Sequence, residues 1–442
     1  MVLTIDEVLA LAPDAASAKS ARGLTGTGQW PLLGSDASSV WGECQGSGAR
    51  PYQTQVDLSG PAFKCSCPSR KFPCKHGLAL LLIRAQDRSA LTSTTPPAWV
   101  TEWLASRADK AQKKDQKVAE KAAAPVDPAA ALARETQRWA RLTTAASELQ
   151  RWLADRMAQG LGAGDATDTS AWRTMAARMV DAQAPGLGQR LRDAADGLGA
   201  TPDWPERTLH RLGLLQLACE ALQRRETLPA PMQADLRTLA GWPFEKADVL
   251  AAGEAVDDRW TVLGVTTELR EAKLTERRVW LHGERHGRRA WLLEHAFGGR
   301  GFETAWTPGT AVDAVLTFYP GAAALRVATP DSVGPAGAAR WPATDNAGEW
   351  RAIATRVAAC PWNTLLPLVL HAAVVVRDGE RSFAVSDGRA LPMRLVDADT
   401  WSLLAVSGGH PVTVMGEWDG RTLTPLTAWD ADAQPLWTRR PA

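Results

Sequence analysis

The stretch Phe63-Lys-Cys65-Ser-Cys67-Pro-Ser-Arg-Lys-Phe-Pro-Cys74-Lys-His76-Gly-Leu78 places three cysteines and one histidine close together in the chain. Two cysteines at positions i and i+2 of an extended strand point to the same side, so the thiolates of Cys65 and Cys67 can converge on one ion. Cys74 and His76 can then complete a tetrahedron of sulfur and nitrogen ligands. Because four protein ligands leave no open coordination position, the spacing predicts one structural zinc ion rather than a catalytic one.

Basic residues surround these candidate ligands, and no acidic residue occurs between Phe63 and Gln86. They are Lys64, Arg70, Lys71 and Lys75. Three thiolates on one divalent ion leave a negative centre, and nearby cations favour the thiolate form. Charge balance is therefore one explanation of the basic cluster. Contact with phosphate or with a protein partner is the other, and the residues leave both open.

The order Cys-x-Cys, a gap, and Cys-x-His at the start of a helix resembles the pattern of SWIM-type zinc fingers, and all four ligand positions match. The resembling part runs from about Arg50 to Gln86. The resemblance implies a ββα-like finger that binds zinc and contacts DNA or protein. The layout of finger, helical middle and Trp-rich β region also resembles bacterial SWIM proteins of similar length. Such proteins occur beside MoxR-type ATPases and von Willebrand A-domain proteins, which implies an adaptor role with one of these as partner.

The totals favour an ordinary globular protein of several domains, because the chain has 442 residues of which 45% are apolar and 22% charged. A formal net charge of +1 gives no overall attraction to nucleic acid or to a membrane. Three of the six cysteines lie in the cluster, which suits a reducing compartment better than a disulfide framework. The first residues are acidic where a signal peptide is basic, and we expect a cytoplasmic protein without a membrane span.

Changes in composition and periodicity divide the chain into five parts. They are an N-terminal unit at 1–104 that holds the finger at about 50–86, an Ala- and Lys-rich linker or helix at 105–130, a helical domain at 131–245, a β-rich domain at 246–365 and a small β domain at 366–442. The expected fold class is multidomain α+β, and the chain ends in a small barrel or an open sheet.

Apolar periodicity carries the prediction of the middle domain. Leu142, Leu149 and Leu153 recur at helical spacing, and a second stripe begins at Leu209 after Pro205. From about residue 246 the pattern changes to short β segments. His282 and His286 have the spacing of zinc-protease histidines, but Gly283 and Gly287 between flanking strands favour the tip of a hairpin.

The sequence contains no Gly-x-Ser-x-Gly elbow, no Walker loop and no dinucleotide fingerprint. Cys44, Cys219 and Cys360 fit small buried residues better than nucleophiles. We therefore expect a non-catalytic protein whose finger contacts a protein partner. DNA binding through the basic finger surface stays open as an alternative, and so does an enzyme with an unrecognised site in the C-terminal β region.

Overall fold

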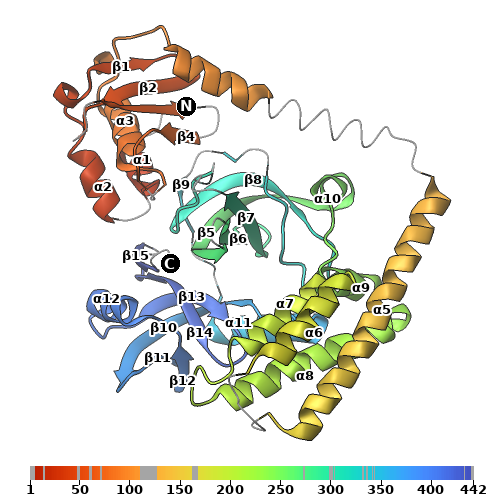
Figure 1. Ribbon diagram of the computed structural model, residues 1–442. Helices are drawn as coiled ribbons and strands as arrows, with labels where there is room; N and C mark the ends of the chain where they lie inside the picture. The colour runs from red at the N-terminus through yellow and green to blue at the C-terminus, as the bar shows by residue number, and fades with distance from the viewer. Residues whose placement is uncertain are drawn as a thin grey trace.

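The computed structural model describes residues 5–12, 15–46, 50–58, 62–69, 72–109, 127–161, 168–271, 274–297, 302, 304–330, 333–334, 337–340, 342, 344–432 and 434–439. Arg70, Lys71 and most of the predicted linker at 105–130 lie outside these residues. The chain mixes helices and sheets in the predicted order: an N-terminal α/β unit, a helical region, and two antiparallel sheets (Figure 1). The predicted fold class is thus confirmed.

The N-terminal unit is a four-stranded antiparallel sheet packed on helices. The strands, in the order β1-β2-β3-β4, are β1 (Leu32–Ser35), β2 (Ser39–Cys44), β3 (Tyr52–Asp57) and β4 (Ala62–Cys65). The helices are α1 (Ile5–Ala10), α2 (Ala15–Arg22) and α3 (Lys75–Gln86). Residues 98–109 form a further helix, which Arg107 ties to Asp57 at 3.2 Å. Helix α3 is buried from His76 to Ile83 because the sheet and the two other helices enclose it.

Strands β1 and β2 extend the sheet beyond the ββα-like finger that the sequence predicts. Gly34 and Gly42 interrupt the apolar pattern there, and this hid the strands from sequence reasoning. Both glycines are needed for packing: a Cβ at Gly34 would lie 2.3 Å from the Trp41 indole nitrogen, and one at Gly42 would lie 2.8 Å from the Trp30 ring. Indole rings therefore occupy the space that side chains would otherwise fill.

The middle of the chain is helical, as predicted. Its helices are α5 (Pro128–Gln159), α6 (Ser170–Asp181), α7 (Pro185–Ala195), α8 (Trp204–Gln223), α9 (Ala230–Leu239) and α10 (Lys246–Ala252). Leu142, Leu149 and Leu153 are buried in one apolar core. The stripe on α8 differs in one position from the prediction: Leu209 is 50% exposed, and Thr208 takes the buried position beside it.

The first C-terminal sheet has the strand order β7-β6-β5-β8-β9. Its strands are β5 (Glu254–Glu271), β6 (Leu274–Gly283), β7 (Arg289–Phe297), β8 (Thr310–Phe318) and β9 (Gly337–Ala338). Strands β6 and β7 form the predicted hairpin, in which the Gly287 N–H donates to the Gly283 carbonyl at 2.9 Å. His282 and His286 therefore belong to a hairpin and its tip.

The second sheet has the order β12-β11-β10-β13-β14-β15. Its elements are α11 (Asn346–Ala359), β10 (Leu366–Asp378), β11 (Arg381–Ser386), β12 (Arg389–Met393), α12 (Asp397–Ser407), β13 (Val412–Trp418), β14 (Leu423–Trp429) and β15 (Pro435–Thr438). Met393 of β12 also pairs with Leu423 of β14 in parallel, so the sheet curls back on itself. Helix α11 packs on this sheet through Ile353.

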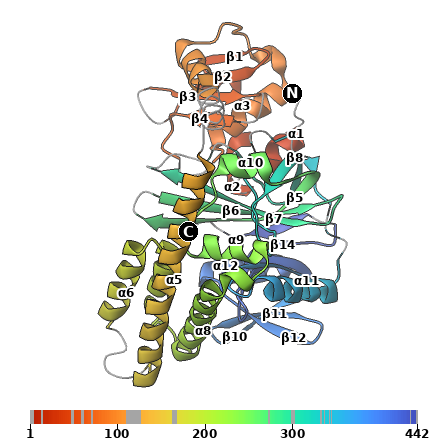
Figure 2. The same cartoon turned by 90° about the vertical axis from the view of Figure 1, so that its right-hand side faces the viewer.

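The two sheets and the N-terminal unit lie one above another (Figure 2). Leu263 and Trp280 of the first sheet pack with Val369 and Met415 of the second in a shared apolar cluster. Trp260, Trp280 and Trp429 are among the largest fully buried side chains, so several of the 20 tryptophans serve as core filler.

Candidate metal centre

The four predicted zinc ligands come from the junction of strand β4 and helix α3. Cys65 ends β4, Cys67 follows two residues later, Cys74 caps the N-terminus of α3, and His76 lies in its first turn. Their ligand atoms all lie within 4.8 Å of one another, and Cys65 Sγ is 3.8 Å from His76 Nδ1. Tetrahedral zinc with Zn–S bonds of about 2.3 Å needs ligand atoms about 3.8 Å apart. The residues therefore fit a zinc ion.

Strand register and helix capping hold this arrangement in place. Thr54 of β3 stands opposite Cys65 of β4, and the Thr54 hydroxyl lies 3.1 Å from Cys65 Sγ. The Gly77 N–H donates to Cys74 Sγ at 3.5 Å, as the first turn of a helix does to its cap. Sequence reasoning missed Thr54 and Gly77. The residues Tyr52 to Leu58, which have the composition of a strand, contained the signal, because pairing this strand with the Cys-x-Cys strand brings Thr54 to Cys65.

Hydrogen bonds among the three neighbouring thiols shift their pKa values. The pKa of Cys67 lies far below its ordinary value, because the thiols of Cys65 and then Cys74 donate hydrogen bonds to its thiolate. The pKa of Cys74 is raised, first by its hydrogen bond to Cys65, and the pKa of Cys65 is raised by its hydrogen bond to Cys67. The close thiols thus shift one another's pKa values in opposite directions. A divalent cation removes this conflict, because it stabilises all three thiolates at once.

The centre is closed to solvent on its helix side. Cys74 is 7% exposed and His76 5% exposed, while Cys65 and Cys67 are half-buried. The ring of Tyr52 lies 5.1 Å from that of His76, measured between centroids. Four protein ligands in this setting suit a structural ion that fastens β4 to α3.

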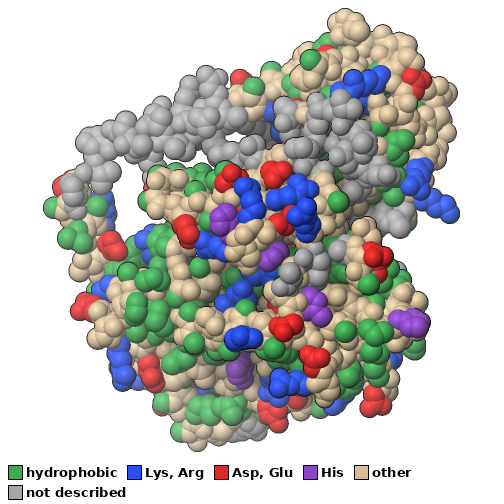
Figure 3. Space-filling view, turned by 180° about the vertical axis from the view of Figure 1, so that it is seen from behind, with side chains coloured by type: hydrophobic (Ala, Val, Ile, Leu, Met, Phe, Trp, Pro, Cys, Tyr) green, Lys and Arg blue, Asp and Glu red, His purple; other side chains and the backbone are tan. Residues whose placement is uncertain are grey.

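Lys64 and Lys75 are exposed next to the ligands. Arg70 and Lys71 lie outside the described residues. In the view from behind, Lys and Arg side chains are interspersed with Asp and Glu and do not form a continuous basic stripe on that face (Figure 3).

The other cysteines take packing positions. Cys44 is fully buried on β2 and is not one of the four clustered ligands; burial, and then the nearby Cys65, raises the pKa of its thiol. Cys219 and Cys360 belong to the core of the helical region. Burial raises the pKa of Cys219 to about 12, so its thiol stays protonated and unreactive.

The hairpin histidines have structural surroundings as well. Burial and then the charge of Arg289 lower the pKa of His282 to about 3. His286 Nδ1 lies 2.9 Å from Asp258 Oδ2, and the same carboxylate accepts the backbone N–H groups of Arg285 and His286. This fully buried carboxylate shapes the hairpin tip. Among the described residues, only the Cys65, Cys67, Cys74 and His76 group brings together three or more potential ligands.

Comparison with known families identifies two parts of the chain. The SWIM zinc finger family matches residues 52–85, and the SWIM-associated four-helix bundle domain matches residues 137–240. The first match covers all four ligands, and the second covers most of α5 and continues to the end of α9. No curated protein and no solved structure matches the chain. The described helices include none with the length and apolar character that a membrane span needs.

Proposed function

The chain carries a SWIM zinc finger followed by a SWIM-associated four-helix bundle domain, and on this premise we propose that it is a non-catalytic interaction protein that binds one structural zinc ion and contacts a protein partner through its finger. The closed ligand set carries the proposal. Three cysteines and one histidine fill every position of a tetrahedral ion, so the metal builds a surface and leaves no site for substrate or water.

A protein partner is favoured over nucleic acid by the distribution of charge. The basic residues of the finger, Lys64, Arg70, Lys71 and Lys75, all lie beside the metal ligands in the sequence, and the whole chain has a net charge of only +1. A finger that bound DNA by itself would need several phosphate contacts. The lysines have an adequate role in balancing the thiolates of a negative zinc centre.

For the partner we propose a MoxR-type ATPase or a von Willebrand A-domain protein, in an adaptor arrangement. This part rests on the resemblance to bacterial SWIM proteins. The test is titration calorimetry of the zinc-loaded full chain with a MoxR-type ATPase from the same source. We expect saturable binding that the Cys67→Ser variant loses.

The DNA alternative is tested by fluorescence anisotropy with a labelled 20-base-pair duplex over a salt series. Wild-type protein is compared with the double variant Lys64→Ala/Lys75→Ala. DNA binding by other parts of the chain contributes equally to both proteins and does not affect the difference in affinity. Equal affinity of the two proteins supports the protein-contact proposal. A loss of about tenfold or more in the variant, with a flatter salt dependence, would assign the finger to DNA instead.

A further inference from the structure

The second sheet has the connections of an OB-type barrel. Strands β10, β11 and β12 form a meander, α12 follows β12, β13 pairs antiparallel with β10, and β14 pairs parallel with β12. This is the order of the OB fold, a partly open five-stranded barrel whose second and third strands bind oligonucleotides or oligosaccharides. The second and third strands here are β11 and β12.

The outer face of β11 and β12 is free, whereas the opposite side of the barrel is covered. Val369 and Met415 on the opposite side are buried against the first sheet. Strands β11 and β12 lie at the outer edge of the molecule (Figure 1). Val376, Phe383 and Pro392 form one cross-strand row on the more exposed face, with Val376 39% exposed and Phe383 half-buried. This row offers an apolar and aromatic platform.

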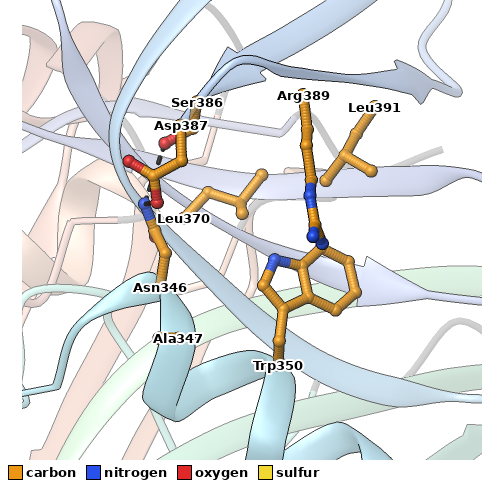
Figure 4. A pocket seen from close by; sticks show the side chains of 8 residues that line it. All are labelled: Asn346, Ala347, Trp350, Leu370, Ser386, Asp387, Arg389 and Leu391. Atoms are coloured by element: carbon orange, nitrogen blue, oxygen red, sulfur yellow. Dashed lines mark hydrogen bonds between the residues drawn. The ribbon is translucent and has the colours of Figure 1, made fainter.

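A pocket of about 250 Å³ opens where β11 turns into β12. It is lined by Asn346, Ala347, Trp350, Leu370, Ser386, Asp387, Arg389 and Leu391. The Arg389 side chain extends toward the indole of Trp350, and Asn346 lies beside Ser386 and Asp387 on the other side (Figure 4). The Asn346 amide lies 2.8 Å from both Ser386 Oγ and Asp387 Oδ2, which fixes the turn.

The lining selects a flat ligand with hydrogen-bond donors at its edge. Trp350 offers an aromatic face above an apolar floor, and the volume is below that of a typical drug-sized site. Unpaired bases are held in this way, stacked on aromatic rings or guanidinium planes and recognised along their edges. Asp387 can supply an acceptor, and guanine presents two adjacent N–H donors along one edge. Arg389 is exposed and forms no ion pair with any described residue, so its charge is available to a phosphate.

We propose that this barrel binds single-stranded nucleic acid, with one guanine base on Trp350 in the pocket and the adjoining backbone on Arg389. Asp387 accepts from the Watson–Crick edge of the base. The outer row of Val376, Phe383 and Pro392 lies on the opposite face of β11 and β12 from Arg389 and Leu391, so it takes no part in this site. This function is separate from the finger and does not depend on its partner.

The test uses the zinc-loaded full chain and labelled 12-mers, namely (dT)12, the same strand with three central dG, and their RNA equivalents. Asp387→Asn removes the charge but keeps an acceptor for Asn346, and asparagine tolerates the φ of 49° at this position. Arg389→Ala removes an exposed side chain. Arg151→Ala, on the exposed face of α5, is the matched control for loss of charge.

We expect the strands with guanine to bind more tightly than (dT)12, and Asp387→Asn to lose about tenfold of that preference. Arg389→Ala should weaken every strand by about five- to tenfold and lower the salt slope by about one. Arg151→Ala and Lys64→Ala/Lys75→Ala should bind as wild type. The DNA and RNA arms show which strand the barrel prefers.

Three results would overturn the proposal. One is the absence of binding to all strands in 50 mM salt. Another is binding that Asp387→Asn and Arg389→Ala leave unchanged, which places any nucleic-acid site elsewhere. The third is binding of a labelled maltohexaose in place of the strands, which would make the barrel a carbohydrate site.

Discussion

The finger and the junction between the two C-terminal sheets solve the same problem, the fastening of two elements, by opposite means. In the finger, ligands from one short stretch, Cys65 to His76, converge on one point. In the junction, charged residues far apart in the chain meet in the interior. Arg289 of β7 pairs with Glu349 of α11 at 2.6 Å with both side chains 4% exposed, and Arg278 pairs with Glu417 at 3.0 Å.

The difference lies in what each arrangement demands of the rest of the fold. The finger requires only a strand, a turn and a helix start, and a metal ion supplies the free energy. The buried ion pairs are costly to desolvate and are favourable only when the surrounding sheets hold both partners. Removal of one ligand should therefore damage the finger locally, whereas removal of one charge should weaken the junction of the sheets.

The largest effect is expected from Cys67→Ser. Structural zinc contributes about 10 kcal/mol or more to small fingers, so the variant should lose its metal and the local fold around α3. Zinc content measured by mass spectrometry should fall from one ion per chain to near zero. Hydrogen exchange should accelerate in β4 and α3 and stay unchanged in the two C-terminal sheets.

Cys44→Ser is the matched control for this experiment. Cys44 lies on β2, where it pairs with Tyr52 of the finger strand β3, but it is not one of the clustered ligands. This variant should therefore keep its zinc. A soluble Cys67→Ser protein with a full complement of zinc would contradict the ligand assignment.

The second effect in size is expected from Glu349→Ala. The variant leaves Arg289 buried beside His282 and without its acidic partner. Loss of one member of a buried pair costs about 3–5 kcal/mol, which denaturant unfolding can measure. The zinc content should not change.

Glu206→Ala tests whether burial is the cause of the large loss of stability expected from Glu349→Ala. Glu206 pairs with Arg421 at the surface, where the two side chains are 69% and 38% exposed. We expect a loss of less than about 1 kcal/mol. Equal losses of stability in Glu349→Ala and Glu206→Ala would show that burial does not make the ion pairs of the junction more important than a surface pair.

The same contrast explains what the sequence could predict. Ligand spacing is local, so the finger and its candidate ligands were accessible from a short stretch, and helical periodicity indicated the middle region. Strands β1 and β2 were missed because Gly34 and Gly42 break their pattern. The pairing of Arg289 with Glu349 was out of reach, because it depends on how α11 packs against two sheets. The pocket at Trp350 and Arg389 was hidden for the same reason.

An intermediate effect, dependent on pH, is expected from Asp235→Asn. Burial raises the pKa of Asp235 from 3.8 to about 6, although its carboxylate accepts the Ala322 N–H at 2.8 Å. The folded state therefore holds this proton more tightly than the unfolded state. The contribution of Asp235 to the stability of the wild-type protein is therefore fully present below about pH 4 and is lost as the pH rises through 6.

Relative to the variant, the wild-type protein should lose about 2–3 kcal/mol between pH 4 and pH 7. Urea unfolding at both pH values measures this change, and the asparagine keeps an oxygen for the Ala322 N–H. Parallel stability curves for the two proteins would show that Asp235 does not titrate in this range.

The smallest effect is expected from Gly77→Ala in the finger. A Cβ at this position would lie 2.8 Å from Cδ1 of Phe63, so the ring or the start of α3 must move, at a cost of about 1–2 kcal/mol. Competition with a chelator should show weaker zinc binding, because Gly77 follows the ligand His76 directly. Gly213→Ala is the opposite case: nothing lies within 4 Å of its Cβ inside α8, and the change should stabilise the helix by about 0.5–1 kcal/mol. If both substitutions raised stability, helix propensity alone would explain them, and the contact between Phe63 and the first turn of α3 would have no part in holding the metal ligands.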